Sequence, residues 1–180
     1  RTARSLYAAG FRPGDKVLNA FSYHFTPAAS MVEHGALAVG CTVVPGGTGQ
    51  TEMQAAAIRD LGLTAFAGTP SFLKLIVEKA DELKTDITSL DKAIVGAEYL
   101  PPTLRKSFNE RGIRVGQLYA TADLGLIAYE SLMAAGAVNE GMIVDEGIIL
   151  EIVRPGSGDP VPPGEVGEVV VTSFNPDYPL

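Results

Sequence analysis

The sequence of 180 residues has little cysteine, and Cys41 is the only one. A single thiol excludes an intramolecular disulfide and fits a reducing cytoplasm. By residue type, His24, His34 and Cys41 are candidate metal ligands, but their spacing matches no known metal-binding pattern. We therefore interpret them as a buried thiol and two histidines next to helices.

Long apolar runs and an excess of basic residues are also missing. No run approaches the roughly 20 apolar residues of a membrane span, and no signal peptide opens the sequence, so we expect no membrane association. The formal net charge is −7. Such a chain lacks the broad positive field that nucleic-acid binding needs, and we expect no nucleic-acid partner. A homodimer is left open.

Helix and strand signals alternate over the first two thirds of the chain. Four times, an amphipathic stretch ends at a glycine, which tolerates the backbone that closes a helix, and a short apolar run follows; the glycines are Gly10, Gly40, Gly62 and Gly112. Helices are expected near 3–9, 27–39, 51–61, 70–83 and 102–110. Strands are expected near 16–20, 42–44, 64–67, 92–96 and 114–118. This alternation predicts an α/β fold with a mostly parallel sheet covered by helices.

Three helix starts are marked by capping residues. Thr26-Pro27 and Thr69-Pro70 place a hydroxyl before a proline of the first turn, and Thr51 with Gln54 has the spacing of a capping box. Ahead of Thr51, the glycine-rich stretch 45–51 lies where phosphate loops occur. It lacks their lysine and their glycine spacing, so we interpret it as a turn.

The pattern changes near residue 126. The runs 142–144, 147–153 and 165–172 are β-rich, are separated by Pro/Gly turns, and have no helical segment between them. They predict an antiparallel, barrel-like appendage. The expected organisation is an α/β region at 1–125 and a β-rich region at 126–180.

Two strand ends carry candidate site residues. The predicted strand at 92–96 runs into Gly96, Ala97, Glu98 and Tyr99, and the one at 114–118 is followed by the stretch Tyr119–Asp123. Carboxyl ends of parallel strands meet at one sheet edge, where open α/β sheets bind ligands. Small residues allow a flat ligand to approach the backbone, an aromatic ring can stack on a base, and a carboxylate can hold Mg²⁺. The alternatives to a ligand site are a plain turn after the first of these strands and a helix cap after the second.

The stretch 21–26 follows the first predicted strand and contains three aromatic residues, Phe21, Tyr23 and Phe25. Aromatic side chains at a strand end are suited to an apolar substrate pocket. They are equally suited to core packing under the next helix, and both interpretations stay open here.

The order of these segments resembles the phenylacetate-CoA ligase family of adenylate-forming, AMP-binding acyl-CoA ligases. The resemblance covers nearly the whole chain. It is carried by Ala3–Leu6 with Gly10, Pro13-Gly14-Asp15, Gly68-Thr69-Pro70-Ser71, Gly96-Ala97-Glu98, Tyr119–Asp123 and the stretch 162–172.

The resemblance implies a two-step reaction with ATP and coenzyme A. An aromatic or other organic acid attacks the α-phosphate of ATP to give an acyl-adenylate and pyrophosphate, and coenzyme A then displaces AMP to form a thioester. It further implies an adenine and acyl site of Gly96, Ala97, Glu98 and Tyr99, with Gln117 and Thr121 nearby. Tyr119 would stack on adenine, Asp123 would be the catalytic, Mg²⁺-binding carboxylate, and Tyr23 and Phe25 would line the acyl pocket.

The sequence departs from the family pattern at this site. The family motif Tyr-Gly-x-Ser/Thr-Glu reads Tyr119-Ala120-Thr121-Ala122-Asp123. The phosphate-binding hydroxyl is therefore missing at Ala122, and the Asp123 carboxylate is one methylene shorter than glutamate. Gln117 stands where aspartate is usual, and Tyr99 where proline is usual.

Two larger parts of the family have no counterpart among these residues: a Ser/Thr/Gly-rich triphosphate loop, and the small C-terminal domain with its lysine. Because the sequence also starts without methionine, we expect an internal fragment that is inactive alone. Two competing hypotheses remain: a non-catalytic ligase-like binding domain, and an unrelated α/β nucleotide-binding module.

Overall fold

The computed structural model describes residues 1–133 and 137–174. The chain forms two compact units, Arg1–Ile143 and Val144–Leu180. The sequence places the boundary at 125/126 instead. Residues 126–143 belong to the first unit because strand β6 (Gly125–Tyr129) pairs with strand β5 (Arg114–Thr121). Positions 134–136 and 175–180 of the predicted β-rich region lie outside the described residues.

The first unit alternates strands and helices in the expected order. Its elements are α1 (Thr2–Ala8), β1 (Lys16–Asn19), α2 (Ala28–Val39), β2 (Thr42–Pro45), α3 (Thr51–Leu61), β3 (Ala65–Gly68), α4 (Pro70–Leu83), β4 (Lys92–Val95), α5 (Pro102–Glu110), β5, β6 and, at the junction of the units, β7 (Ile143–Val144). The sheet has the strand order β2-β1-β3-β4-β5-β6-β7. The first five of these are parallel neighbours, and β6 runs antiparallel to β5.

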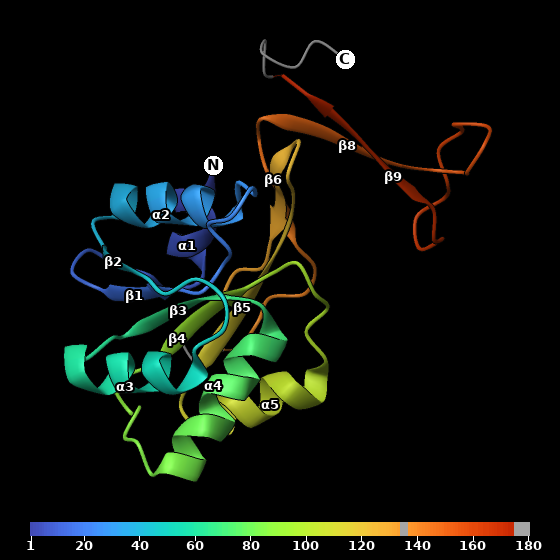
Figure 1. Ribbon diagram of the computed structural model, residues 1–180. Helices are drawn as coiled ribbons and strands as arrows, with labels where there is room; N and C mark the ends of the chain where they lie inside the picture. The colour runs from blue at the N-terminus through green and yellow to red at the C-terminus, as the bar shows by residue number, and fades with distance from the viewer. Residues whose placement is uncertain (134–136, 175–180) are drawn as a thin grey trace. The chain divides into compact units, whose positions relative to one another are not determined.

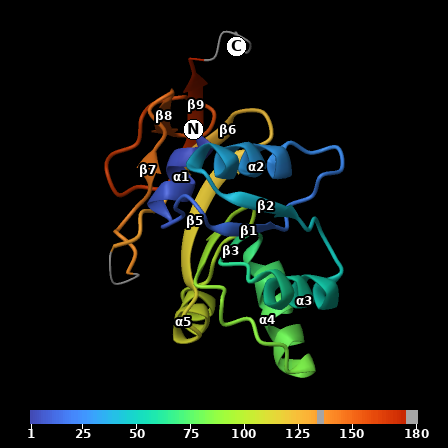
Figure 2. The same cartoon turned by 90° about the vertical axis from the view of Figure 1, so that its left-hand side faces the viewer.

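Helices cover both faces of the parallel strands. Helices α1 and α2 lie over one face, and α3, α4 and α5 lie over the other (Figures 1 and 2). Adjacent strand residues point to opposite faces. Leu18 and Phe66 accordingly pack into the cluster under α3–α5, whereas Val17 and Ala65 pack into the cluster under α1 and α2. Burial on both faces explains why β3 is a continuous run of apolar and small residues and why the middle of β1 is apolar on both sides.

The predicted helix ends at Gly40 and Gly62 are correct, the C-caps of α1 and α5 lie one residue before Gly10 and Gly112, and one predicted N-cap is present. Gly40 and Gly62 close α2 and α3 with left-handed backbone, and the Thr69 hydroxyl accepts a hydrogen bond from the Phe72 amide. The other two caps are wrong. The N-cap of α2 is Pro27 rather than Thr26, and α3 begins at Thr51 after Gln50.

The glycine-rich stretch explains the missing capping box. The side-chain amide of Gln54 donates to the carbonyl oxygens of Gly47 and Gly49, at 2.9 and 2.8 Å. Gln54 therefore holds the loop before α3 instead of reaching back to an N-cap amide.

The second unit contains an antiparallel pair, β8 (Ile148–Val153) and β9 (Glu168–Ser173). A mostly parallel, helix-covered sheet followed by antiparallel strands is the predicted fold class, which is confirmed. In the described parts of the chain, no helix has the length and apolar character of a membrane span.

A buried ion pair lies at the amino ends of the parallel strands. The Asp15 carboxylate accepts hydrogen bonds from the ammonium group of Lys92 at 2.9 Å, the hydroxyl of Thr64 at 2.8 Å and the backbone amide of Arg12 at 2.7 Å. Burial alone would raise the pKa of Asp15, but these bonds and the Lys92 charge outweigh it and lower that pKa below 3.8. Asp15 thus connects the segment before β1 to β3 and β4.

We expect Asp15→Asn to lower the free energy of unfolding by about 2 kcal/mol at pH 7, because Lys92 keeps only the half-exposed Asp91 as its partner. The native pKa of Asp15 is lowered, so its stabilisation is present above about pH 3.8 and is lost as the pH falls through the native pKa. The difference between the variant and the wild type should therefore shrink below pH 3.8.

Urea unfolding at pH 7 and pH 3 measures both effects. The matched control is Asp60→Asn, which removes an exposed ion pair with Arg59, and it should leave the midpoint unchanged. A variant as stable as the wild type at pH 7 would show that the ion pair adds nothing.

Candidate functional site

The strand ends predicted to form a site lie at one edge of the sheet. The Gly96 amide, just past β4, donates to the carbonyl oxygen of Gly68, the last residue of β3, at 3.1 Å. On its other side Gly96 lies against β5, where a Cβ on Gly96 would be 2.6 Å from Cδ1 and 3.1 Å from the carbonyl oxygen of Leu118. Because Gly96 has no side chain, the loop after β4 can lie this close to β5.

Ala97 and Glu98 form the next part of this edge. Ala97 is exposed and has φ of 64°, a left-handed conformation that residues with a Cβ rarely adopt. The Glu98 carboxylate accepts bonds from the hydroxyl of Ser71 at 2.8 Å and the amide of Ser71 at 3.3 Å. Glu98 therefore links the loop after β4 to the start of α4, while Tyr99 beside it is 72% exposed.

The stretch Tyr119–Asp123 forms the end of β5 and the turn into β6. Tyr119 is 42% exposed rather than buried in the core. The Thr121 hydroxyl accepts a bond from the Leu124 amide at 3.1 Å, which closes the turn, and no helix follows for it to cap. Ala122 and Asp123 are exposed in the turn. The half-buried Gln117 pairs through its backbone with Glu130.

A cavity of about 200 Å³ opens at the same edge, between β5 and the start of α2. Its lining is mostly apolar and includes Ala97 and Ala120 from the strand ends and Phe21 from the loop after β1. The remaining lining residues are Thr2, Thr26, Pro27, Ala28, Met31, Val32, Leu118, Thr121, Ala122 and Leu126. The structure thus brings Ala97 and Thr121 of the predicted site together around one cavity.

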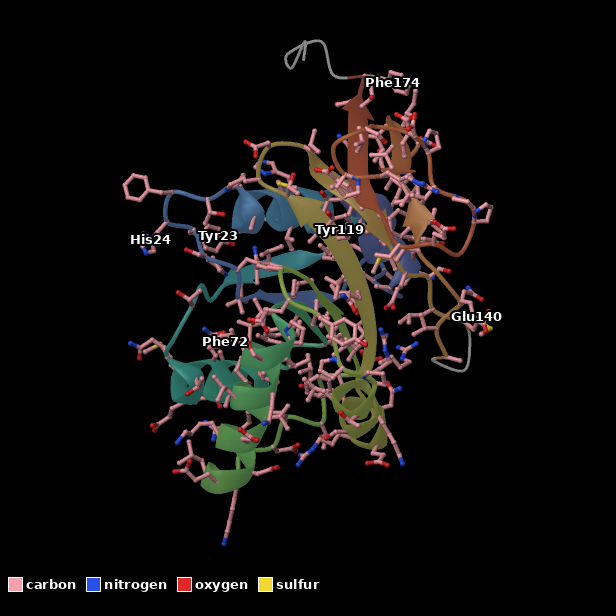
Figure 3. The ribbon with its side chains drawn as sticks, turned by 90° about the vertical axis from the view of Figure 1, so that its right-hand side faces the viewer. Tyr23, His24, Phe72, Tyr119, Glu140 and Phe174 are labelled. Carbon is pink, nitrogen blue, oxygen red and sulfur yellow. The ribbon has the colours of Figure 1, made fainter. Side chains whose placement is uncertain are left out.

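Tyr23 and Phe25 are placed elsewhere. Phe25 is fully exposed, and neither residue lines the cavity. The Tyr23 hydroxyl donates to Glu33 at 2.7 Å, and burial together with that carboxylate raises the pKa of Tyr23 to about 12. Tyr23 and His24 lie on the loop after β1, apart from Tyr119 on β5 (Figure 3).

Phe21 belongs to the aromatic stretch for which a substrate pocket is one interpretation, but sequence reasoning missed the cavity residues Met31 and Val32. A signal for them existed, since Ala28, Met31 and Val32 share the apolar face of α2. The first turn of that helix lies beside the carboxyl ends of the strands. Part of the apolar face of α2, which the sequence pattern predicts to be core, therefore lines a cavity.

Mg²⁺ needs few protein ligands when a nucleotide supplies phosphate oxygens, so a single exposed carboxylate such as Asp123 fits such an ion. Within residues 1–133 and 137–174, no group of three or more His, Cys, Asp and Glu residues could hold a metal ion unaided. The chemistry of this edge therefore suits a metal ion only together with a nucleotide.

Comparison with known proteins decides the family. The family of AMP-binding enzymes matches residues 1–175. The chain belongs to the AMP-binding enzyme family. It is 31% identical to the phenylacetate-coenzyme A ligase of Thermus thermophilus and 34% identical to that of Escherichia coli, in each case over 96% of the chain. This AMP-binding chain spans 39% and 40% of the length of those two relatives.

Solved structures agree on the fold. A 2-hydroxyisobutyryl-CoA ligase in complex with 2-HIB-AMP and CoA superposes with a TM-score of 0.85 at 23% identity, covering 96% of this AMP-binding chain and 39% of that one. An anthranilate CoA ligase bound to anthranoyl-AMP gives a TM-score of 0.73 at 20% identity, covering 96% and 34%. The match to the AMP-binding enzyme family over residues 1–175 contradicts the hypothesis of an unrelated nucleotide-binding module.

The left-handed Ala97 generates a prediction on stability. Ala97→Gly removes the steric cost of φ 64°, so we expect it to raise the free energy of unfolding by up to about 1 kcal/mol. The control Ala56→Gly, inside α3, should lower it by about 1 kcal/mol. Urea unfolding measures both variants, and equal destabilisation by the two would show that Ala97 carries no strain.

Proposed function

We propose that the protein containing this chain is an AMP-forming acid–thiol ligase that activates a small, largely apolar organic acid. The observation that carries the proposal is the position of the cavity: it opens at the sheet edge where Ala97 and the turn after Tyr119 meet. An acid held there would present its carboxylate toward that edge. Membership of the AMP-binding family and the similarity to phenylacetate-CoA ligases support the same reaction.

In this proposal the nucleotide lies along the edge formed by Gly96–Tyr99 and Tyr119–Asp123. The half-exposed ring of Tyr119 is available for stacking on adenine. Gly96 brings this loop against β5, the small side chain of the exposed Ala97 allows the adenylate to approach closely, and Glu98 holds the loop through Ser71. Catalysis then consists of orienting the carboxylate of the acid toward the α-phosphorus.

Asp123 is the proposed ligand of Mg²⁺, and Thr121 fixes the turn that presents it. When bound, the ion would neutralise charge on the phosphate oxygens. The carboxylate oxygen of the acid forms a bond to the α-phosphorus as pyrophosphate leaves. The sulfur of coenzyme A then forms a bond to the carbonyl carbon as AMP leaves.

The apolar lining favours a hydrocarbon or aromatic acid over a polar one, because a polar group in this cavity would lose its hydrogen bonds with water. About 200 Å³ suits an acid of the size of benzoate or phenylacetate. Roles for Tyr23 and Phe25 in substrate binding stay a prediction that would require the loop after β1 to rearrange. A cytoplasmic location, consistent with one unpaired thiol, and a homodimer also remain predictions.

The test is acid-dependent ATP–pyrophosphate exchange by the full-length protein, followed by detection of the CoA thioester. We expect phenylacetate or benzoate to support exchange better than acetate does. Ala120→Leu, which fills the cavity, should raise KM for the aromatic acid by about 10-fold or more and leave KM for ATP nearly unchanged.

The matched control is Ala57→Leu, on α3 away from the cavity, and it should leave both KM values unchanged. Equal effects of Ala120→Leu on both substrates would place the acid elsewhere. An absence of exchange with any acid would contradict the proposed reaction.

A second function is favoured by Ala122 and Asp123, which depart from the family motif. A ligase-like domain that binds an acyl-AMP-like ligand without turnover would bind AMP in calorimetry but show no exchange. It would also gain no activity from the double variant Ala122→Ser with Asp123→Glu.

Residues 1–180 alone are expected to show no ATP–pyrophosphate exchange, because they span about 40% of the length of the ligases that they match. The matched control is the full-length protein at equal concentration. Exchange by the 180 residues would show that the groups described here suffice for the first step.

A further inference from the structure

Asn19, the last residue of β1, is fully buried at the carboxyl edge of the sheet. Its side-chain amide donates to the carbonyl oxygen of Ala29 and to the hydroxyl of Tyr23, both at 2.9 Å. Its side-chain oxygen accepts from the Phe21 amide at 3.3 Å. A single buried side chain therefore connects the loop after β1 to the first turn of α2.

The groups that Asn19 holds belong to the wall of the cavity. Phe21 lines the cavity, and its backbone amide bonds to Asn19. Ala29 lies in the first turn of α2, between the cavity residues Ala28 and Met31. Asn19 itself does not line the cavity.

Tyr23 and Glu33 extend this connection. The Tyr23 hydroxyl accepts from Asn19 and donates to Glu33, which lies one turn further along α2 than Ala29. The loop after β1 is therefore attached to α2 at two points, at Ala29 through Asn19 and at Glu33 through Tyr23. This arrangement gives Tyr23 a role behind the cavity wall.

We propose that Asn19 is a positioning residue that sets the shape of the acid-binding cavity, and so the choice of acid, by holding Phe21 and the start of α2 from behind. The proposal rests on the proposed ligase function, because it concerns the cavity assigned there to the acid. A buried amide suits this role because it supplies two donors and one acceptor without charge. An apolar residue would leave the Ala29 oxygen and the Phe21 amide without these partners.

The test compares Asn19→Ala with the wild type in the full-length protein. The ratio of kcat/KM for phenylacetate to kcat/KM for acetate is the main readout, because it does not depend on the fraction of protein that is folded. We expect this ratio to fall by about 10-fold or more as the wall loosens, with KM for ATP nearly unchanged. Tyr23→Phe removes only the outer connection, so it should lower the ratio less.

Two further measurements separate positioning from general loss of stability. Ser89, which lies between α4 and β4, donates a partly buried hydrogen bond to the carbonyl oxygen of Leu63. The variant Ser89→Ala removes this bond and should leave the ratio of the two kcat/KM values unchanged. Hydrogen exchange should become faster at the Phe21 amide in Asn19→Ala. The Gly46 and Gly47 amides bond to the backbone oxygen of residue 19, which the variant keeps, so their exchange should stay slow.

An unchanged acid ratio in an active Asn19→Ala variant would overturn the inference, and so would unchanged exchange at Phe21. A fall in the ratio for Ser89→Ala equal to that for Asn19→Ala would also overturn it. If the wild type makes no acyl-adenylate, the proposed function fails instead. The exchange rate at Phe21 then decides by itself whether Asn19 holds the wall.

Discussion

Burial of the parallel strands on both faces is the constraint on which the rest of the structure depends. Strands β1, β3 and β4 lie between two helical layers, so their central residues are apolar on both faces, and the polar Asn19 and Lys92 stand at strand ends. Parallel neighbours require a crossover after each strand, and the helices provide these crossovers. All five parallel strands therefore end at the same edge, and segments from residue 20 to residue 122 meet there.

The two edges of this sheet differ in how far their polar and aromatic groups are exposed to solvent. At the amino ends, Asp15 and Lys92 form a largely buried pair whose hydrogen bonds are satisfied within the protein. At the carboxyl ends, Ala97, Tyr99 and Tyr119 leave backbone and rings exposed. The amino edge thus carries a largely buried ion pair, and the carboxyl edge carries ligand-accessible surface. Strained backbone at Ala97 on the accessible edge fits that division, since such conformations tend to occur at functional sites.

The sequence predicted the elements well because each boundary had a local cause. Gly40 and Gly62 close helices through their own backbone freedom, and Thr69 caps α4 through its own hydroxyl. The capping box at Thr51 failed because Gln54 found carbonyl partners in the preceding glycine-rich loop. Residue spacing alone does not show that competition.

The site was predictable to the extent that topology determines it. Strand order places Gly96 beside Leu118, so the meeting of the two predicted stretches followed from reading parallel strands. The direction of a loop side chain does not follow from topology. The Tyr23 hydroxyl bonds to Asn19 and Glu33, whereas Phe21, two residues earlier, lines the cavity. Both aromatic residues follow the end of β1 closely in the sequence, so their sequence positions alone predict the same location for both.

The departures from the family motif fall on two parts of the site that do different work. Ala120 stands at the glycine position of the motif, and it lines the cavity. Ala122 and Asp123 lie in the exposed turn next to it; Ala122 still lines the cavity, whereas Asp123 lies outside it, where the proposal places the metal. A methyl group at residue 120 acts on the space available to the acid, whereas the shorter carboxylate at 123 acts on charge near phosphate. Substitutions at 120 should therefore change which acid is accepted, and substitutions at 123, which does not line the cavity, should change the rate for every acid alike.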